Sequence, residues 1–418
     1  MTNQPGKLSL PQLAAVVAGN ALEFYDFLIF GTFAIPIGAT FFPAKDATGS
    51  LLLTLATFGV GFLTRPLGGI VIGRLGDRIG RKAGMLLSFG LMGLSIVGLA
   101  LTPSYARIGV AAPILVVCFR LVQGFALGGE VGPTTAFLME AAPVEKRGLY
   151  VSLQFATQNA ATCFGGIVGV VLASLLTPAQ VSAWGWRVAM LLGAAVVPVT
   201  LAIRRHLPET LELRTATRSE GLTGAQIGMA LLTLLAMAAA TITTYVLINI
   251  NLFAMHTLGM SPAQGYGAVV IGGLTGVISN SLGGWLSDRL GRKPPTVLAF
   301  GLLCLAGVPC FMAMAHWRTA PVLYAAIAVM AALLGLGLPS IMAQVSENLP
   351  LRMRSGAIGI IYAVAITVFG GSASLIVTWL TAVTGSPLAP AFYMCAALGL
   401  GTLAMLMLRE TAPVKTGW

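Results

Sequence analysis

The stretch Gly73-Arg74-Leu75-Gly76-Asp77-Arg78-Ile79-Gly80-Arg81-Lys82 returns later in the chain as Gly284-Trp285-Leu286-Ser287-Asp288-Arg289-Leu290-Gly291-Arg292-Lys293. Seven of the ten positions are identical, and the copies lie 211 residues apart (288 − 77), about half of the 418-residue chain. Each copy lies between two long apolar runs. A basic turn repeated in this way indicates an internally duplicated membrane protein. Anchoring by positive charge alone does not require the same Asp and Gly positions twice.

The composition excludes an ordinary soluble domain. The chain is 57% hydrophobic and 9% charged, whereas a soluble domain is about 25% charged. The segments 221–287 and 355–408 contain no Asp, Glu, Lys or Arg. A helix needs about 20 apolar residues to cross a bilayer, so each segment holds at least two spans. The 51 glycines fit close packing between membrane helices.

The apolar segments predict an all-α membrane protein with twelve spans in two sets of six. We expect a first six-helix bundle over 1–204, a cytoplasmic linker over 205–224, and a second six-helix bundle with a short tail over 225–418. The predicted spans lie near 12–39, 51–73, 83–103, 110–139, 149–177, 187–204, 225–256, 262–287, 295–315, 321–346, 356–384 and 387–408.

The distribution of Lys and Arg predicts the orientation. If both tails lie on one side, that side collects eighteen basic residues and the other only Lys45, Arg107 and Arg318. Basic loops stay in the cytoplasm, so both termini are predicted to be cytoplasmic, and 1–11 is expected to be a tail rather than a signal peptide. The net charge of +11 therefore marks membrane topology and not a nucleic-acid surface. The expected setting is the cell inner membrane.

Other partners are not indicated by the sequence. The five cysteines (Cys118, Cys163, Cys304, Cys310 and Cys395) all lie in apolar runs without metal-ligand spacing. No nucleophile–base pair is visible, so we expect neither an enzyme nor a cofactor or metal. The expected partners are a small carboxylate substrate, protons and the lipid bilayer, with the protein acting as a monomer.

Charged residues inside the predicted spans point to a function, because each costs at least about 2.5–3.5 kcal/mol in lipid. Glu23 and Asp26 lie in the first span, and Arg120 and Glu130 lie in the fourth. At 1.5 Å per residue, Asp26 and Arg120 both reach about 18–20 Å from the inner face. We therefore predict that they pair.

Two interpretations of this pair remain open. A carboxylate that exchanges Arg120 for a proton would couple transport to protons, with Asp26 as the favoured acceptor and Glu23 and Glu130 behind it. The alternative is a fixed ion pair that joins two helices. Arg120, with Gln123 one turn later, is also a candidate to bind an anionic substrate. Arg65 in the second span is a candidate for substrate binding or gating, and the alternatives are an Arg that snorkels to the interface or a structural pair with Glu130.

Polar stripes in two further spans are candidates to line a cavity. Gln154, Gln158 and Asn159 recur along the fifth span, where the alternative is contact between helices. Tyr245 and Asn249 belong to the polar run of the seventh span, the counterpart of the first span in the second half. His256 lies near the outer end of that span. Histidine side chains can titrate near neutral pH, but a lone His at the membrane interface more often takes no part in proton coupling.

These residues resemble a known family. The doubled loop is similar to the signature of the major facilitator superfamily. Within that superfamily, the chain resembles the metabolite:proton symporter family. The residues that carry this resemblance are the first span, Arg65-Pro66-Leu67-Gly68-Gly69, Gln123-Gly124, Gly129-Glu130 and Trp186-Arg187. The likeness extends to citrate–proton symporters through Phe41-Phe42-Pro43-Ala44 and Phe369-Gly370-Gly371. The chain departs from that pattern after the Thr run of the seventh span, where it reads Asn249-Ile250-Asn251.

The resemblance implies a central cavity between two bundles and a gating role for the repeated loop. Asp77 would lie near Arg147 and the start of the eleventh helix, and Asp288 near Arg354 and the start of the fifth helix, close to Gly148. These contacts would hold the cytoplasmic side closed. The residues assigned to this gate are Gly73, Asp77, Arg78, Gly80, Arg81, Lys82, Arg147, Asp288, Arg289, Gly291, Arg292, Lys293 and Arg354.

The expected function is proton-coupled uptake of a small organic anion, citrate or a related tri- or dicarboxylate, by alternating access. The alternatives are a carrier of another metabolite, such as 2-oxoglutarate, shikimate, betaine or proline, and an efflux antiporter. A receptor that binds solute without moving it is disfavoured, because the predicted linker and tail are too short for a signalling extension.

Overall fold

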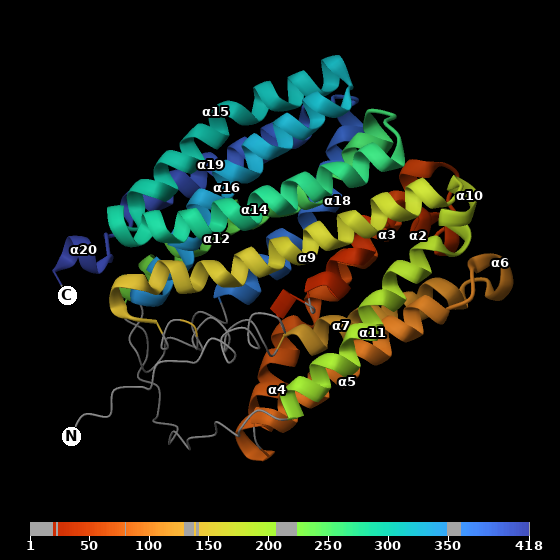
Figure 1. Cartoon of the computed structure of the whole chain (residues 1–418), viewed down its shortest axis with the longest axis horizontal. Coiled ribbons are helices and arrows are strands. Elements are labelled where there is room, and N and C mark those ends of the chain that lie inside the picture. Colours follow the sequence, from red (N-terminus) through yellow and green to blue (C-terminus); the bar gives the residue numbers. More distant parts are fainter. Residues whose placement is uncertain are drawn as a thin grey trace.

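A computed structural model describes residues 20–21, 24–79, 81–128, 138, 142–205, 224–348 and 361–417. Every regular element in these ranges is helical, and Figure 1 shows long helices lying side by side. The elements before the linker are α2 (Ala34–Phe41), α3 (Ala47–Leu63), α4 (Arg65–Ile79), α5 (Arg81–Leu101), α6 (Tyr105–Ile108), α7 (Ala111–Leu127), η1 (Val144–Lys146), α9 (Arg147–Leu175), α10 (Pro178–Gln180), η2 (Val181–Gly185) and α11 (Trp186–Arg205).

The later elements repeat the pattern of long apolar helices. They are α12 (Gly224–Ile248), α13 (Ile250–Leu252), η3 (Phe253–Thr257), α14 (Pro262–Leu290), α15 (Lys293–Trp317), α16 (Ala320–Asn348), η4 (Ala365–Gly370), α18 (Gly371–Thr384), α19 (Ala389–Met407) and α20 (Pro413–Thr416). Short 3-10 and π-helical turns join or interrupt several of them, as is common where a helix ends or bends.

Eight helices in the described residues are long and apolar enough to cross a membrane. A bent pair, 24–32 with Ala34–Phe41, makes a further candidate, and Leu86–Leu101 and Ala111–Leu127 are shorter apolar helices. The prediction of a polytopic helical membrane protein is confirmed, while the full count of twelve stays a prediction. The eight spans are Ala47–Ile72, Val144–Leu175, Gly228–Ile248, Pro262–Leu290, Lys293–Trp317, Ala320–Val345, Ile361–Thr384 and Ala389–Met407.

Several contacts join helices from before and after the linker. In the two most extensive, α9 packs along α14 (Figure 1) and α3 packs against α18. Glycine permits both approaches, because a Cβ on Gly284 would lie 2.6 Å from the carbonyl oxygen of Gly148, and one on Gly59 would lie 2.5 Å from that of Gly371. Backbones that meet at small residues can pack tightly in a membrane, where apolar burial gives no driving force.

Two helices break at corresponding places. The first span bends by 69° at Phe33, and α12 ends at Ile248 before the single turn of α13. Such a break frees backbone carbonyls, which must find donors inside a membrane. Asn251 Nδ2 donates to the carbonyl oxygen of Thr32 at 2.8 Å, and Asn249 Nδ2 donates to that of Tyr245 at 3.1 Å. The Asn251 amide therefore satisfies a carbonyl at the first break, while the carbonyl oxygen of Tyr245 also accepts from the backbone N–H of Asn249 at 3.3 Å.

Candidate functional site

Two buried guanidinium groups meet at one aromatic ring. Arg65 on α4 and Arg120 on α7 each place the guanidinium carbon 4.4 Å from the centre of the Phe27 ring. Arg120 is completely buried and Arg65 is 6% exposed. Phe62 also lies under Arg65, at 4.5 Å, and the contact of a desolvated cation with a ring is worth about 2 kcal/mol. The aromatic rings thus help to hold two like charges close together inside the bundle.

The predicted ion pair between Asp26 and Arg120 is wrong. Within the described part of the chain, Arg120 has no carboxylate within salt-bridge distance; its Nη1 donates to Gln123 Oε1 at 2.5 Å and its Nη2 to the carbonyl oxygen of Phe58 at 3.3 Å. Gln123 Nε2 in turn donates to the backbone oxygen of Asp26 at 3.2 Å. The predicted level is correct, but Gln123 links the two residues and the carboxyl group points elsewhere.

The Asp26 side chain turns toward α11. It is 4% exposed, and its Oδ1 has no hydrogen-bond donor among the described residues. A Cβ on Gly193 of α11 would overlap this oxygen and would lie 3.1 Å from Cγ of Asp26. The neighbouring Tyr25 donates its hydroxyl to the carbonyl oxygen of Ala189 at 2.9 Å, one turn earlier in α11. No pattern in the sequence predicts this contact, because it depends on how the first and sixth spans pack.

A wall of aromatic rings lies next to the guanidinium groups. Phe27 and Phe62 meet edge to face at 4.7 Å between ring centres, and Phe58 lies 5.1 Å from Phe27. Tyr245 of α12 continues the wall, at 5.5 Å from Phe62 and 6.1 Å from Phe58. Tyr245 therefore connects the charged groups of the earlier helices with the polar run of the seventh span.

Tyr245 also lines a central cavity of about 90 Å³. The predicted residues Gln158, Asn159 and Tyr245 line it, as do Asn280 and Tyr362, which were not predicted. Asn280 is an amide inside the predicted span 262–287, and its position within an apolar segment was an available signal. Of the other residues predicted to bind substrate, Arg65, Arg120, Gln123, Gln154 and Asn249 do not line this cavity.

The remaining predicted residues have identifiable neighbours. The backbone oxygen of Gln154 accepts a hydrogen bond from Asn20 Nδ2 at 3.2 Å, so this part of α9 contacts the first span. Asn249 and Tyr245 line a second cavity of about 240 Å³, together with His256. His256 Nε2 lies 3.3 Å from the hydroxyl of Thr48. Glu23 and Glu130, both predicted proton-coupling residues, lie outside the described residues.

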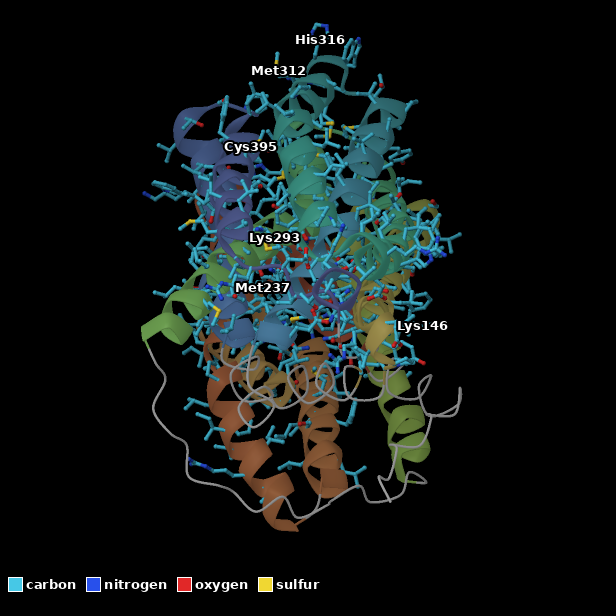
Figure 2. All side chains as sticks on the ribbon, turned by 90° about the vertical axis from the view of Figure 1, so that its left-hand side faces the viewer. Lys146, Met237, Lys293, Met312, His316 and Cys395 are labelled. Atoms are coloured by element: carbon cyan, nitrogen blue, oxygen red, sulfur yellow. The ribbon has the colours of Figure 1, made fainter. Side chains whose placement is uncertain are left out.

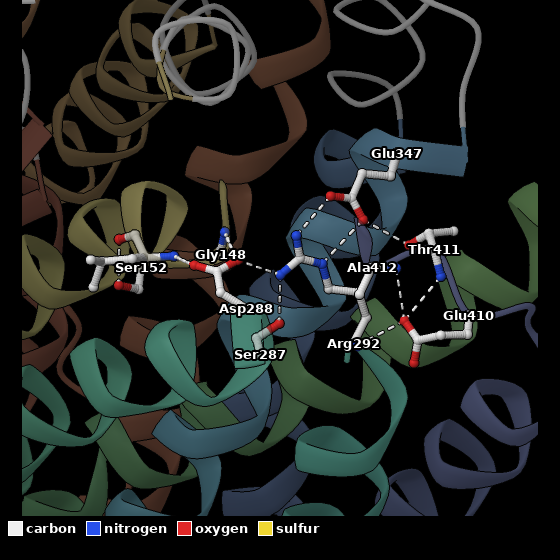
Figure 3. Close-up of polar contacts among 10 residues, drawn as sticks. Gly148, Ser152, Ser287, Asp288, Arg292, Glu347, Glu410, Thr411 and Ala412 are labelled. Carbon is white, nitrogen blue, oxygen red and sulfur yellow. Dashed lines mark hydrogen bonds and ion pairs between the residues drawn. The ribbon is translucent and has the colours of Figure 1, made fainter. Parts of the chain in front are cut away.

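A polar cluster closes the end of the bundle where α14 ends and α20 lies, here called the Asp288 end. Figure 2 faces this end, with Lys146 and Lys293 labelled. Asp288 accepts hydrogen bonds from the backbone N–H groups of Gly148 and Leu149 at 2.8 Å each (Figure 3). These groups belong to the first turn of α9, where the helix dipole favours a negative charge. The contact that the resemblance implied between Asp288 and Gly148 is therefore present.

Arg292 connects Asp288 to the last helices (Figure 3). Its Nη1 lies 2.7 Å from Asp288 Oδ1, and its Nη2 lies 2.8 Å from Glu347 Oε1, while Nε donates to Glu347 Oε2 at 3.1 Å. Such a two-point contact with a carboxylate suits the planar guanidinium group. Arg354, the expected neighbour of Asp288, lies outside the described residues.

Glu410 caps the start of α15. It accepts hydrogen bonds from the backbone N–H groups of Arg292, Lys293, Thr411 and Ala412 at 2.8–3.0 Å. Burial alone would raise the pKa of Glu410, but these donors outweigh it and hold the pKa below its usual value. The segment after α19 is thereby fixed to the Asp288 end, and α20 also contacts α14 and η1.

The rest of the repeated loop divides between described and undescribed residues. In the second copy, Arg289 lies 4.2 Å over the ring of Trp285, Lys293 Nζ donates to the carbonyl oxygen of Leu406 at 2.8 Å, and Gly291 has a φ of +106°, which favours glycine. In the first copy, Gly73, Asp77, Arg78, Arg81 and Lys82 belong to α4 and α5, but their side chains are outside the description, as is Gly80. The expected contact of Asp77 with Arg147 stays a prediction.

Comparison with known proteins decides the family. A model of the Major Facilitator Superfamily matches residues 16–363 and 229–417. The chain belongs to the Major Facilitator Superfamily. It is therefore a multi-pass transporter of the inner membrane and not an enzyme.

Curated relatives match nearly the full length. A citrate-proton symporter of Salmonella typhi is 34% identical over 407 residues, covering 94% of this chain and 93% of the relative. An alpha-ketoglutarate permease of Escherichia coli is 32% identical over 391 residues, covering 90% and 88%. A proline/betaine transporter of Escherichia coli is 28% identical over 424 residues, covering 96% and 84%.

A solved structure supports the fold. The crystal structure of a D-xylose-proton symporter superimposes with a TM-score of 0.75 over 98% of this chain and 99% of the other, at 17% identity. The inward open conformation of the xylose transporter of E. coli also gives 0.75, over 96% of both chains, at 17% identity. At this identity, the likeness establishes the fold alone.

Proposed function

We propose that this member of the Major Facilitator Superfamily is a proton-coupled symporter that takes up a small organic anion by alternating access. The substrate we favour is citrate or a related tri- or dicarboxylate. One observation carries the proposal: Arg65 and Arg120 are buried at the ring of Phe27, and the preceding residue, Asp26, has a buried carboxyl group that points toward α11. The guanidinium groups supply attraction for an anion, and the carboxyl group supplies an acceptor for a proton.

Arg120 supports an anionic substrate. A buried charge without a counter-charge is strongly unfavourable, and Arg120 faces no carboxylate within the described ranges. A carboxylate substrate would compensate it, and a guanidinium group offers two parallel donors for that purpose. The aromatic wall separates Arg120 from the central cavity, so substrate binding would require Tyr245 or the phenylalanine rings to move.

Asp26 supports proton coupling. Its Oδ1 can take a proton without breaking a hydrogen bond to any described residue. Protonation before the anion binds would reduce the net charge that crosses the membrane with it. Glu23 and Glu130 remain candidates for the same role in this proposal, and Gln158, Asn159 and Tyr245 are the proposed contacts of the substrate in the cavity.

The Asp288 end supports alternating access. The carboxylate of Asp288 joins the start of α9 to the end of α14, which lie on opposite sides of the linker. We propose that this end faces the cytoplasm with both termini, that twelve helices form two bundles over 1–204 and 225–418 joined by 205–224, and that a monomer transports. Opening inward would then break the Asp288 contacts.

The relatives support two alternative classes of substrate. The alpha-ketoglutarate permease supports a keto acid, which Arg120 would bind in the same way. The proline/betaine transporter supports a zwitterion, which a guanidinium group can bind through its single carboxylate. The efflux antiporter is a further alternative with the same fold but opposite proton movement.

Uptake into proteoliposomes tests the proposal. Labelled citrate is offered under an imposed inward proton gradient, with and without a protonophore, and alpha-ketoglutarate and betaine are offered in parallel. We expect accumulation of a carboxylate that collapses with the protonophore and that makes the outside medium more alkaline. Accumulation of betaine alone would overturn the anion assignment, and accumulation driven by an outward proton gradient would identify an antiporter. Protein-free vesicles are the control.

A further inference from the structure

The carboxyl group of Asp26 occupies a notch in α11. Gly193 is buried, and a Cβ at this position would overlap Asp26 Oδ1 and approach Cδ1 of Tyr25 to 3.1 Å. The hydroxyl of Tyr25 donates to the carbonyl oxygen of Ala189, which lies one helical turn before Gly193. Two consecutive residues of the first span thus fit against two positions, four residues apart, on the same face of α11.

The backbone of Asp26 is connected to Arg120, while its side chain is not. Gln123 spans the gap, accepting from Arg120 and donating to the Asp26 carbonyl oxygen. This relay fixes the backbone of Asp26 close to the guanidinium group. The notch at Gly193 therefore determines where the carboxyl group points, and any larger residue would fill the space that the carboxyl group occupies.

The groups that the structure places near Tyr25 and Asp26 come from four other helices. From α11 they are the backbone atoms at Ala189 and Gly193, and from α9 the ring of Phe164 lies 5.4 Å from that of Tyr25. From α7 the charged group is Arg120, reached through Gln123, and from α4 it is Arg65, on the ring of Phe27. Among the described residues, Tyr25 is the titratable neighbour on the same helix.

We propose that Gly193 is a positioning residue for proton coupling: its notch holds the carboxyl group of Asp26 away from Arg120, in the arrangement that carries the proton. Loss of the proton lets the side chain rotate out of the notch toward Arg120, which frees the notch and neutralises the guanidinium group. This inference rests on the proposed function. The inference places the protonated carboxyl group against α11 and the deprotonated one beside Arg120 of α7.

The test compares Gly193→Ala with Gly90→Ala. A Cβ on Gly90 of α5 would meet nothing within 4 Å, so this variant makes the same chemical change in open space. Three quantities are measured in proteoliposomes: proton-driven accumulation of the substrate that the wild type accumulates, exchange of that substrate without a gradient, and the pH profile of exchange. For Gly193→Ala we expect accumulation to fall about tenfold, because filling a packed site displaces the side chain there, with a shifted pH profile and exchange retained.

The outcomes separate this inference from the proposed function. Wild-type accumulation and pH profile in Gly193→Ala would overturn the positioning role while leaving the symporter intact. If the wild type itself accumulates no substrate under a proton gradient, the proposed function fails instead.

A double variant covers the case in which Gly193→Ala damages the fold. In the background Asp26→Asn, where exchange is measured alone, Gly193→Ala should have an effect on the pH profile no larger than that of Gly90→Ala. An equal shift of the profile with and without the Asp26 carboxyl group would show that Gly193 acts through another residue, and the inference would be wrong.

Discussion

The carboxylate of Asp288 accepts a 2.8 Å hydrogen bond from the backbone N–H of Gly148, a residue 140 positions earlier in the chain. Gly148 lies in the first turn of α9 and Asp288 in the last turn of α14, so one contact joins two helices that belong to different halves of the sequence. A side chain at Gly148 would meet Arg292 Nη1 and Asp288 Oδ1, both 2.8 Å from its Cβ, so glycine is required for the approach.

Replacing Asp288 by Asn should open this end of the transporter. The amide keeps one acceptor but loses the ion pair with Arg292, and a hydrogen bond to a charged group contributes about 1.5–3 kcal/mol. We expect a Ser152→Cys reporter, buried beside Gly284, to react with a thiol reagent at least about tenfold faster in this variant. The natural cysteines are replaced first, and Glu145→Gln, an exposed change in η1, is the control. Equal labelling rates in both variants would exclude the latch.

Replacing Arg120 by Lys should impair substrate binding while the protein stays folded. Lys keeps the charge, but it lacks the planar guanidinium group. It therefore cannot donate to Gln123 and to the Phe58 carbonyl while also making a two-point contact with a carboxylate. The loss of such hydrogen bonds is worth about 1.5–3 kcal/mol, so we expect KM to rise about ten- to hundredfold. Initial uptake rates over a range of substrate concentrations measure this. Arg107→Lys, exposed on α6, is the matched control, and similar KM values for both would remove Arg120 from the binding site.

Asp26→Asn should separate transport from the proton gradient. The amide cannot gain or lose a proton at the positions that a carboxyl group uses, so accumulation against a gradient should be abolished. Exchange of labelled substrate should continue, because exchange needs no net proton movement. Both are measured in the same vesicles, with and without an imposed gradient. A variant that still accumulates substrate would show that another group carries the proton.

Tyr245→Phe should weaken substrate binding without disturbing the aromatic wall. The ring contacts with Phe58 and Phe62 remain, and only the hydroxyl of this cavity-lining residue is lost. A lost neutral hydrogen bond is worth about 0.5–1.5 kcal/mol, so KM should rise about two- to tenfold. The thermal unfolding midpoint in detergent should stay that of the wild type. Tyr105→Phe on α6, outside both cavities, is expected to change neither quantity.

Glu410→Gln should reduce stability in a pH-dependent way. The pKa of Glu410 is lowered in the folded protein, so its contribution is complete above the ordinary value of 4.5 and is lost as the pH falls through the folded-state pKa. We expect the variant to melt at a lower temperature than the wild type at pH 7, and the difference to shrink below pH 4.5. Thermal unfolding of the detergent-solubilised protein from neutral to acidic pH checks this. A constant difference over the whole range would contradict the assignment.

The family resemblance of the repeated loop implied a contact that the structure contains, whereas the charges of the first and fourth spans predicted one that it does not. The contact of Asp288 with Gly148 was expected from that resemblance, and the loop by itself indicated only a carboxylate at the end of a helix. Depth along a helix correctly put Asp26 and Arg120 at one level. Depth does not specify rotation about the helix axis or side-chain rotamers, and these send the Asp26 carboxyl group to Gly193.

The sequence by itself determined the membrane class, the duplicated organisation of the basic turns and the polar stripe of the fifth span. These features depend on length, charge and periodicity, which act locally along the chain. Only the tertiary structure decided that the ring of Phe27 contacts two guanidinium groups, that Tyr245 borders both cavities, and that Asn251 supplies the donor for the break near Thr32. Each of these contacts joins residues from different helices, and their partners are set by packing at glycines and at helix breaks rather than by the pattern within any one span.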